Sequence, residues 1–393
     1  MHLSQRSHRH SHPSRRGFFR TVMGSALAGA SILELAQYRA AWAQAGASIA
    51  NADLFDIEKV ADDVYFARAK PTAILNCNAG IFVNSRDVLV VDAHSKPSAA
   101  ASLIAQIKKE ITHKPVRYLV DTHFHWDHSQ GNAAYAANGA KVLASKMTRQ
   151  LMTENSASRL RESLDPNGHG FQGQPRVPAL INAARERLAK ATSAEDKARA
   201  QVQIQQLEAF AAEMKNFSPN LPTITFEKSY VIKDKAHDIH LEFHGRAHTA
   251  GDIVIYCPQR RVIATGDAIM GWTPFIADGY PKDWPKTIDS VSKLDFDRIM
   301  PGHGGVQQGS QRMTNLRNYI QEITERVDGG RKAGRSVADL QETITVASLK
   351  SLNSEGYAEF LAERAGPGVS LAAFLQSSVN GNVAQIYERL DKV

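Results

Sequence analysis

Residues 121–132 read Asp121-Thr122-His123-Phe124-His125-Trp126-Asp127-His128-Ser129-Gln130-Gly131-Asn132 and follow an apolar run, Val116–Val120, that is typical of a buried strand. His123 and His125 are two residues apart, so in extended backbone both side chains point the same way and can reach one cation. Asp127 and His128 come after the chain starts to turn, so we expect them to face a second cation close by. Nitrogen and carboxylate ligands together suit zinc, although iron and manganese also accept them.

Three further ligand candidates occur later in the chain, each after an apolar segment. They are His248 in Gly245-Arg246-Ala247-His248-Thr249-Ala250-Gly251-Asp252, Asp267 in Thr265-Gly266-Asp267, and His303 in Met300-Pro301-Gly302-His303-Gly304. Each has a glycine nearby, which lets the backbone turn tightly and aim the side chain. Each signal is weak alone, and their order after the first cluster is what strengthens them.

Four separated motifs therefore occur in one order: His-x-His-x-Asp-His, Gly-x-x-His-Thr-x-Gly-Asp, Thr-Gly-Asp and Pro-Gly-His-Gly. This pattern resembles the metallo-β-lactamase superfamily over roughly residues 55–310. The resemblance implies an α/β fold, a four-layer αββα sandwich, with two zinc ions per chain at one edge where strand ends meet. It also implies a division of the ligands: His123, His125 and His248 for the first metal, Asp127, His128 and His303 for the second, and Asp267 as the bridge.

Two departures from the family pattern matter, and one further residue resembles it. Members that cleave lactams as a rule have Cys or Ser at the bridging position, so Asp267 is more like the thioesterase, lactonase and phosphodiesterase branches. The usual Gly-Gly after the first cluster is here Gln130-Gly131, so the local turn is expected to differ. Asp92, which follows the apolar run Val88–Val91, resembles the family's buried acid that orients a ligand histidine. A simple strand-end cap is the alternative for Asp92.

The resemblance favours a dinuclear zinc hydrolase that attacks a carbonyl ester-like bond (lactone, thioester, ester or β-lactam) of a small molecule. Two zinc ions can hold a hydroxide between them at neutral pH, and Asp127 is the candidate catalytic residue that holds its proton and passes it to the leaving group. The chain contains no Gly-x-Ser-x-Gly motif for a serine nucleophile. The alternatives are an iron-dependent oxidoreductase on the same fold and a non-catalytic metal-binding protein.

The N-terminus predicts export. Ser14-Arg15-Arg16-Gly17-Phe18-Phe19-Arg20 is a paired-arginine signal, an apolar stretch follows, and Ala41-Trp42-Ala43 is a small-x-small cleavage site. We therefore interpret residues 1–43 as a twin-arginine signal peptide, which predicts contact with the twin-arginine export machinery, a periplasmic or exported protein, and no stable membrane anchor after cleavage.

The net charge is lower once residues 1–43 are removed. The whole chain has a formal net charge of +7, but residues 1–43 hold six arginines and one glutamate, a net of +5. The remaining residues therefore carry +2, which gives no support to nucleic-acid binding or to a nuclease.

The rest of the chain divides into segments of different pattern. We assign residues 44–310 to the sandwich, with a helical insertion at about 146–222, and residues 311–393 to a helical C-terminal extension. The insertion is expected either to pack as an appendage or to cover the site as a lid, and Ser193 is expected to cap one of its helices. Strands are expected at Val64–Phe66, Ile81–Val83, Val88–Val91, Val116–Val120, Lys141–Ala144, Ile224–Phe226, Tyr230–Ile232, Ile239–Phe243, Ile253–Tyr256 and Val262–Ala264, and helices at Ser98–Glu110, with Ser98 as cap, and Pro285–Leu294.

Several isolated residues receive weaker expectations. Cys77 and Cys257 are the only cysteines, and we expect both to be buried thiols rather than a disulfide. The histidines outside the motifs are expected at the surface; they are His113, His169, His237 and His240. Three aromatic residues, Trp126, Trp272 and Tyr280, are candidates to line a substrate cleft, with core packing as the alternative for Trp126. The sequence does not indicate an oligomeric state.

Overall fold

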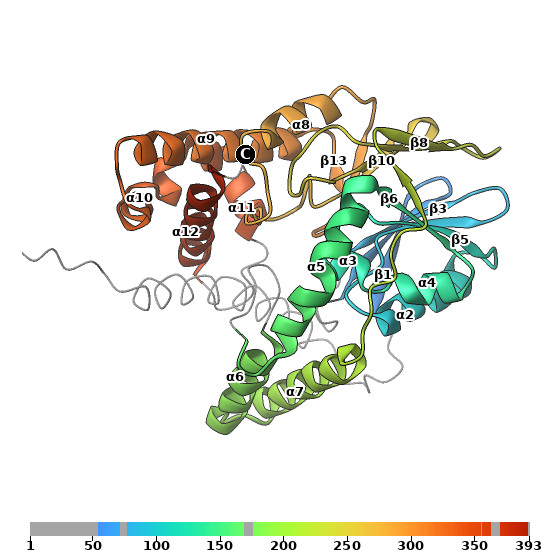
Figure 1. The fold of residues 1–393 in the computed structure, drawn as a ribbon, viewed down its shortest axis with the longest axis horizontal. Coiled ribbons are helices and arrows are strands. Elements are labelled where there is room, and N and C mark those ends of the chain that lie inside the picture. Colours follow the sequence, from blue (N-terminus) through green and yellow to red (C-terminus); the bar gives the residue numbers. More distant parts are fainter. Residues whose placement is uncertain (1–53, 71–76, 169–175, 355, 363–369, 392–393) are drawn as a thin grey trace, which may run out of the picture.

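The structure, a computed structural model, describes residues 54–70, 77–168, 176–354, 356–362 and 370–391 (Figure 1). The predicted twin-arginine signal and His169 lie outside the described residues. Among the described helices, none is both long enough and apolar enough to cross a membrane.

The first sheet has seven strands whose spatial order follows the chain. They are β1 (Phe55–Ala61), β2 (Val64–Ala69), β3 (Ala79–Val83), β4 (Val88–Val91), β5 (Val116–Val120), β6 (Lys141–Ser145) and β7 (Ile224–Phe226). Strands β1 to β4 pair antiparallel, and β4 to β7 pair parallel. A parallel pair needs a crossover connection, and α2 (Pro97–Glu110) provides it between β4 and β5. The carboxyl ends of β4 and β5 consequently lie at the same edge.

The second sheet has six strands in the order β13-β12-β11-β10-β9-β8. They are β8 (Ser229–Ile232), β9 (Ile239–Glu242), β10 (Val254–Cys257), β11 (Val262–Gly266), β12 (Arg298–Pro301) and β13 (Gln307–Gln308). Only β11 and β12 pair parallel, and α8 (Trp284–Val291) lies in the crossover between them. The segments that follow β11 and β12 therefore begin at one edge of this sheet.

Alternating side chains divide the core into layers. Phe82, Val120 and Leu241 belong to the cluster between the two sheets, whereas Ile81 and Leu119 face the opposite side of the first sheet. That outer face is covered by α2 and α4 (Asn132–Ala137). The outer face of the second sheet is covered by α8 and α9 (Gln311–Lys332), as Figure 1 shows. The molecule is thus the expected four-layer αββα sandwich.

Between β6 and β7 the chain forms three helices with a small core of their own. They are α5 (Lys146–Leu164), α6 (Val177–Lys190) and α7 (Ala194–Met214). Leu207 and Phe210 of α7 pack with Trp126, which lies in the short helix α3 (Trp126–Ser129). The hydroxyl of Ser193 accepts a hydrogen bond from the backbone N–H of Asp196, as expected of a helix cap. The insertion therefore packs directly on the helix that contains Asp127 and His128.

After the second sheet the described chain is mainly helical. The helices that follow α9 are α10 (Val337–Thr343), α11 (Tyr357–Ala362) and α12 (Leu371–Arg389), with short 3-10 turns η3 (Val346–Ser348) and η4 (Lys350–Asn353). Leu340, Phe374 and Ile386 join the core cluster of α8 and α9, so these helices extend the layer over the second sheet.

Several local expectations were wrong or incomplete. Ser98 does not cap α2: the N-cap is Lys96, and the Ser98 hydroxyl donates to Glu213 of the insertion. The predicted helix Pro285–Leu294 runs from Trp284 to Val291 instead. Strands β1, β12 and β13 were not predicted, and neither were α3 and α4. These are short elements or edge strands, whose sequence patterns are weak.

Candidate metal centre

The seven predicted ligands converge where strands from both sheets end. His123 and His125 follow β5, Asp267 follows β11, and His303 follows β12. His248 lies in the turn between β9 and β10. Groups of three with ligand atoms within 4.8 Å of one another are His123 with His125 and His248, Asp127 with His128 and His303, and His123 with His128 and Asp267.

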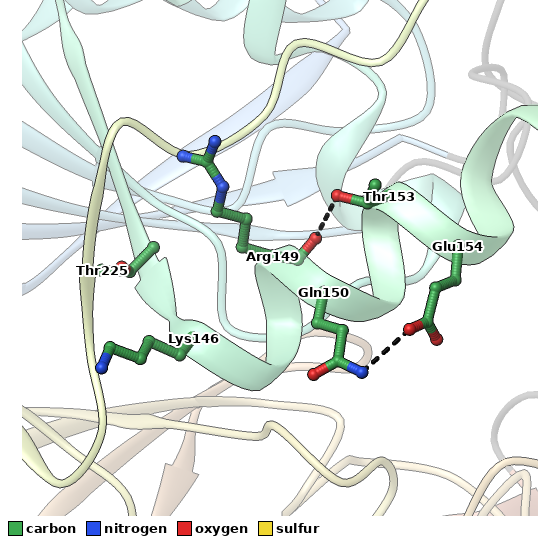
Figure 2. Close-up of a pocket in the computed structure, with 6 residues that line it drawn as sticks. All are labelled: Lys146, Arg149, Gln150, Thr153, Glu154 and Thr225. Atoms are coloured by element: carbon green, nitrogen blue, oxygen red, sulfur yellow. Dashed lines mark hydrogen bonds between the residues drawn. The ribbon is translucent and has the colours of Figure 1, made fainter.

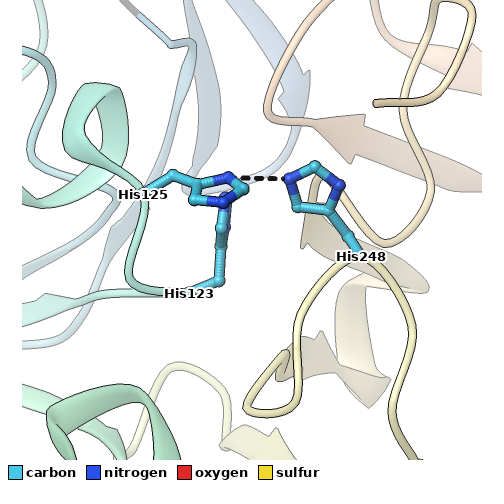
Figure 3. Close-up of side chains that lie close together, drawn as sticks. All are labelled: His123, His125 and His248. Atoms are coloured by element: carbon cyan, nitrogen blue, oxygen red, sulfur yellow. Dashed lines mark hydrogen bonds between the residues drawn. The ribbon is translucent and has the colours of Figure 1, made fainter. Parts of the chain in front are cut away.

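The first group consists of three histidines whose rings meet, two from the segment after β5 and one from the turn before β10 (Figure 3). One ring nitrogen of each is held by an outer partner. Nδ1 of His123 lies 3.0 Å from the Thr122 hydroxyl, and Nδ1 of His248 lies 3.0 Å from the carbonyl oxygen of Phe275. Nε2 of His125 lies 2.8 Å from Asp278. Because carbonyl and carboxylate oxygens only accept, His125 and His248 carry their protons on these outer nitrogens.

The inner nitrogens of His125 and His248 then have lone pairs that face each other. Nδ1 of His125 lies 2.9 Å from Nε2 of His248. Two lone pairs at this distance repel unless a cation or a further proton lies beside them. Nε2 of His123 is buried and has no hydrogen-bond partner among the described residues. These three nitrogens together fit a metal ion.

The second group contains one orienting contact and two close acid–base contacts. Nδ1 of His128 lies 2.8 Å from Asp92, which leaves Nε2 as the ligand atom, 3.5 Å from Asp127. Nε2 of His303 lies 3.0 Å from the same Asp127 oxygen, Oδ2. His128 Nε2 is buried and has no hydrogen-bond partner among the described residues. The donor set of two imidazoles and one carboxylate suits zinc, iron or manganese.

Asp267 lies between the two groups. Its Oδ1 is 3.5 Å from Nε2 of His128, and its Oδ2 is 3.5 Å from Nε2 of His248 and 3.5 Å from Nε2 of His303. The carboxylate therefore faces ligand candidates of both groups, as a bridging ligand must. Oδ1 has no hydrogen-bond partner among the described residues, so the carboxylate retains acceptor capacity for a cation.

The pKa shifts favour the protonation states that metal binding needs at the carboxylates. Burial alone would raise the pKa of Asp127, but His128 and His303 outweigh it and lower the pKa. The same balance, with His303 and His128 as the largest favourable contributions, holds the pKa of Asp267 well below its usual value. Both groups are therefore anionic at neutral pH, which is the form that binds cations.

The histidine pKa values differ between the groups. Burial lowers the pKa of His123 far below its usual value, and burial with the neighbouring His125 lowers the pKa of His248 to about 3. Both imidazoles are therefore neutral and able to bind a metal. Burial alone would lower the pKa of His128, but Cys77 and the carboxylates of Asp127, Asp267 and Asp92 raise it well above its usual value. A divalent cation can balance these carboxylates in place of that proton.

Two glycines allow the backbone to approach the site. A Cβ atom on Gly131 would lie 1.9 Å from the carbonyl oxygen of Ala93, so the glycine that follows Gln130 is sterically required. A Cβ atom on Gly302 would lie 2.4 Å from Oδ1 of Asp267 and 2.7 Å from Cε1 of His128. The Pro-Gly-His-Gly motif thus brings backbone against two ligand candidates.

The sequence did not reveal several residues around the site. Phe275 and Asp278, in the loop of residues 271–283, contact His248 and His125, and Arg159 of α5 pairs with Asp278. The stretch 271–283 contains Trp272, Pro274 and Pro281, but composition of this kind does not assign partners. Cys77 lies close to His128 and Asp92. Cys77 and Cys257 are buried free thiols, as expected.

The three aromatic candidates have different positions. Trp126 is 7% exposed and packs in the core of the insertion. Trp272 stacks on His303 with ring centroids 4.1 Å apart. The guanidinium groups of Arg246 and Arg389 each lie over the ring of Tyr280, 4.3 and 5.0 Å from its centroid. Trp272 is therefore in direct ring contact with a ligand candidate.

One expectation about histidines outside the motifs was wrong. His237 was expected at the surface, but it is 2% exposed and its ring meets that of Phe82 at 6.3 Å. His113 is exposed, and His240 is half-buried beside Glu242. Burial of His237 depends on packing between segments distant in the chain, which local sequence does not report.

A separate surface pocket lies beside the first turns of α5 (Figure 2). Its lining residues are Lys146, Arg149, Gln150, Thr153, Glu154 and Thr225. None of them is a ligand candidate, and within the lining Gln150 donates to Glu154. The pocket is therefore not part of the metal centre.

Comparison with known proteins agrees with this geometry. The family model described as the metallo-beta-lactamase superfamily matches residues 73–303. The linear primary-alkylsulfatase of Pseudomonas sp. (strain ATCC 19151) is 23% identical over 315 residues, which are 77% of this chain and 53% of that protein. The chain thus spans about half the length of this curated relative.

Two solved structures are also similar. A metallo-beta-lactamase from Pontibacter korlensis aligns with a TM-score of 0.47 and 18% identity, covering 67% of this chain and 97% of that one. A metallo-beta-lactamase from Hirschia baltica aligns with a TM-score of 0.46 and 16% identity, covering 68% and 97%.

Proposed function

Because this chain belongs to the metallo-β-lactamase superfamily, we propose that it is a dinuclear zinc hydrolase that cleaves an ester-type bond of a small molecule. The observation that supports the proposal most is the convergence of seven imidazole and carboxylate groups at one edge of the sandwich. The residues that would hold the first ion are His123, His125 and His248, and those for the second are Asp127, His128 and His303. Asp267 would contact both.

The two ions, when bound, would supply a hydroxide nucleophile at neutral pH and polarise the bond to be cleaved. Asp127 is the proposed proton carrier, because its carboxylate is anionic and lies at the site beside His303. It would hold a proton during attack and release it to the leaving group. Asp92 fixes Nδ1 of His128, and Trp272 covers one face of His303. Both side chains limit the movement of ligand imidazoles.

The first substrate class is a carbonyl ester: a lactone, thioester or simple ester. An aspartate at the bridging position disfavours a β-lactam, as argued from the sequence. A sulfate ester is the second candidate, and the similarity to a protein named linear primary-alkylsulfatase favours it. Both reactions require attack of hydroxide on an electrophilic centre and departure of an oxygen or sulfur leaving group, so the same ligand set would serve either.

The test is turnover of a panel containing a lactone, a thioester, an aryl ester, a β-lactam and a primary alkyl sulfate, with metal content measured in parallel. We expect about two zinc equivalents per chain and hydrolysis of one ester class. The variant His125→Ala should lose turnover together with bound metal. Full activity in that variant would contradict the mechanism. One equivalent of iron would favour an oxidoreductase, and bound metal without turnover would favour a binding protein.

We also propose that the enzyme works outside the cytoplasm, after export by the twin-arginine machinery. Arg15 and Arg16 followed by an apolar stretch support this. Residues 1–50 fused to a reporter should direct it to the periplasm, and Arg15→Lys with Arg16→Lys should retain it in the cytoplasm. Equal export of both fusions would refute the assignment.

A further inference from the structure

The loop of residues 271–283 contacts two of the three histidines proposed for the first ion. Asp278 accepts a hydrogen bond from Nε2 of His125 at 2.8 Å, and the carbonyl oxygen of Phe275 accepts one from Nδ1 of His248 at 3.0 Å. The Phe275 ring also meets both imidazoles, at centroid distances of 5.9 and 6.1 Å. The orientation of these two rings therefore depends on where this loop lies.

Asp278 is itself held by the insertion. Arg159 of α5 donates to both oxygens of its carboxylate, at 2.7 and 3.0 Å. The side chains of Asp278 and Arg159 are 15% and 13% exposed, so this is a bidentate pair with little access to water. The guanidinium also lies over the ring of Phe124, 4.8 Å from its centroid.

The charge of Asp278 is consistent with this environment. Burial alone would raise its pKa, but hydrogen bonds from His125 and Arg159 hold the pKa well below its usual range. The carboxylate is therefore anionic. Arg159 compensates a charge that would otherwise be costly to bury.

The same loop is held from the other side by α12. Gln385 accepts a hydrogen bond from the backbone N–H of Ile276 at 2.7 Å. Arg389 donates to the carbonyl oxygen of Gly279 at 2.8 Å and to that of Asp278 at 3.4 Å. Gln385 and Arg389 are one helical turn apart, so they lie on one face of the helix. Helix α12 lies outside residues 73–303, the segment that matches the family.

We propose that Asp278 is a positioning residue of the metal centre, which fixes His125 through Nε2 and is itself held by Arg159 of the insertion and Arg389 of the C-terminal helices. This inference rests on the proposed function, because it assigns Nδ1 of His125 to a cation. A carboxylate on the outer nitrogen fixes the tautomer and ring orientation and increases the basicity of the ligand nitrogen. The insertion and the C-terminal helices would then both help to position a ligand of the metal centre.

The experiment measures zinc affinity of metal-free protein by competition with a coloured chelator, and records the visible spectrum of the cobalt-loaded form. Asp278→Ala should weaken binding of one of the two ions by about 10–100-fold and change the cobalt spectrum, while the other ion is affected less. Arg159→Met and Arg389→Met should weaken the same ion, with Arg159→Lys closer to the wild type than Arg159→Met.

The matched control is Asp283→Ala, which removes a carboxylate of the same loop that pairs with Arg246 and contacts none of the ligand candidates. It should leave zinc affinity and the cobalt spectrum unchanged. Should Asp278→Ala fail to fold when metal-free, the two arginine variants decide the question. Wild-type affinities in the Asp278 variant, or in both Arg→Met variants, would overturn the inference. A wild-type protein that binds no zinc would instead refute the proposed function.

Discussion

The carboxylate of Asp92 lies 2.8 Å from Nδ1 of His128 and also accepts hydrogen bonds from the backbone N–H and the hydroxyl of Thr122. All three residues are buried. The Thr122 hydroxyl in turn faces Nδ1 of His123. One acid therefore orients a proposed ligand of the second ion directly and one of the first ion through a hydroxyl.

Asp92→Asn should weaken zinc binding by about 10–100-fold. The amide keeps one acceptor oxygen for Thr122 but presents an NH₂ group to Nδ1 of His128, so the imidazole must move its proton to Nε2, the ligand atom. Chelator competition measures the change. Asp234→Asn is the control, because Asp234 accepts a similar pair of hydrogen bonds from Ser85 and contacts no ligand candidate. An equal loss in both variants would contradict the assigned role.

Gly302→Ala should disrupt the centre because its new Cβ would lie 2.4 Å from Oδ1 of Asp267. We expect a loss of zinc affinity of about tenfold or more, measured in the same competition assay. Gly305→Ala is the matched control, since a Cβ atom there meets nothing within 4 Å. Unchanged zinc affinity in Gly302→Ala would show that the segment after β12 can move to accommodate the methyl group without disturbing the ligands.

Removal of metal should lower the thermal unfolding midpoint. Without cations, the clustered carboxylates and the facing nitrogens of His125 and His248 repel one another. Zinc at a free concentration of 100 times its dissociation constant should restore about 2.7 kcal/mol of stability per site. Calorimetry of chelator-treated and reloaded protein tests this, with magnesium as the control ion. Equal midpoints would mean that the native fold does not bind zinc preferentially.

His237 should make stability depend on pH. Burial, with Arg260 nearby, lowers the pKa of its imidazole, whereas in the unfolded chain the pKa is about 6.5. Below that value the unfolded chain gains a proton that the folded chain does not, so the free energy of unfolding should decrease as pH falls below about 6.5.

Denaturant titrations between pH 8 and pH 5 should therefore show a weaker pH dependence in His237→Gln than in the wild type. His113→Gln removes an exposed histidine and should leave the dependence unchanged. A His237→Gln variant with the wild-type dependence would exclude this histidine as a source.

The parts of the site that local sequence encodes were predicted, and the parts that depend on distant contacts were not. His123 to His128 follow one strand and share one turn, so their spacing in the sequence determines how these side chains are arranged. Asp267 and His303 are weak signals taken singly, and they were predicted from the order of the four motifs and the resemblance of that order to the family. All seven ligand candidates converge in the fold as expected.

Contacts between residues distant in the chain were not predicted, for a physical reason. Arg159 and Asp278 are 119 residues apart in the chain and meet only when the insertion packs against the loop of residues 271–283. Serine is a common helix-cap residue, yet the hydroxyl and the backbone N–H of Ser98 both donate hydrogen bonds to Glu213, which is 115 residues away in the chain. The local conformational preference for one of these arrangements over another is small in free energy, so tertiary packing decides which one forms.

The stacking of Trp272 on His303 offers an optical probe. The indole lies face to face with the imidazole at 4.1 Å and an interplanar angle of 19°. A cation on that imidazole withdraws electron density from a ring in contact with the fluorophore, so intrinsic fluorescence should change as the second ion binds. Subtraction of the Trp272→Phe emission would isolate this signal from that of the other three tryptophans, Trp42, Trp126 and Trp284. It would follow loading of one ion without any added dye.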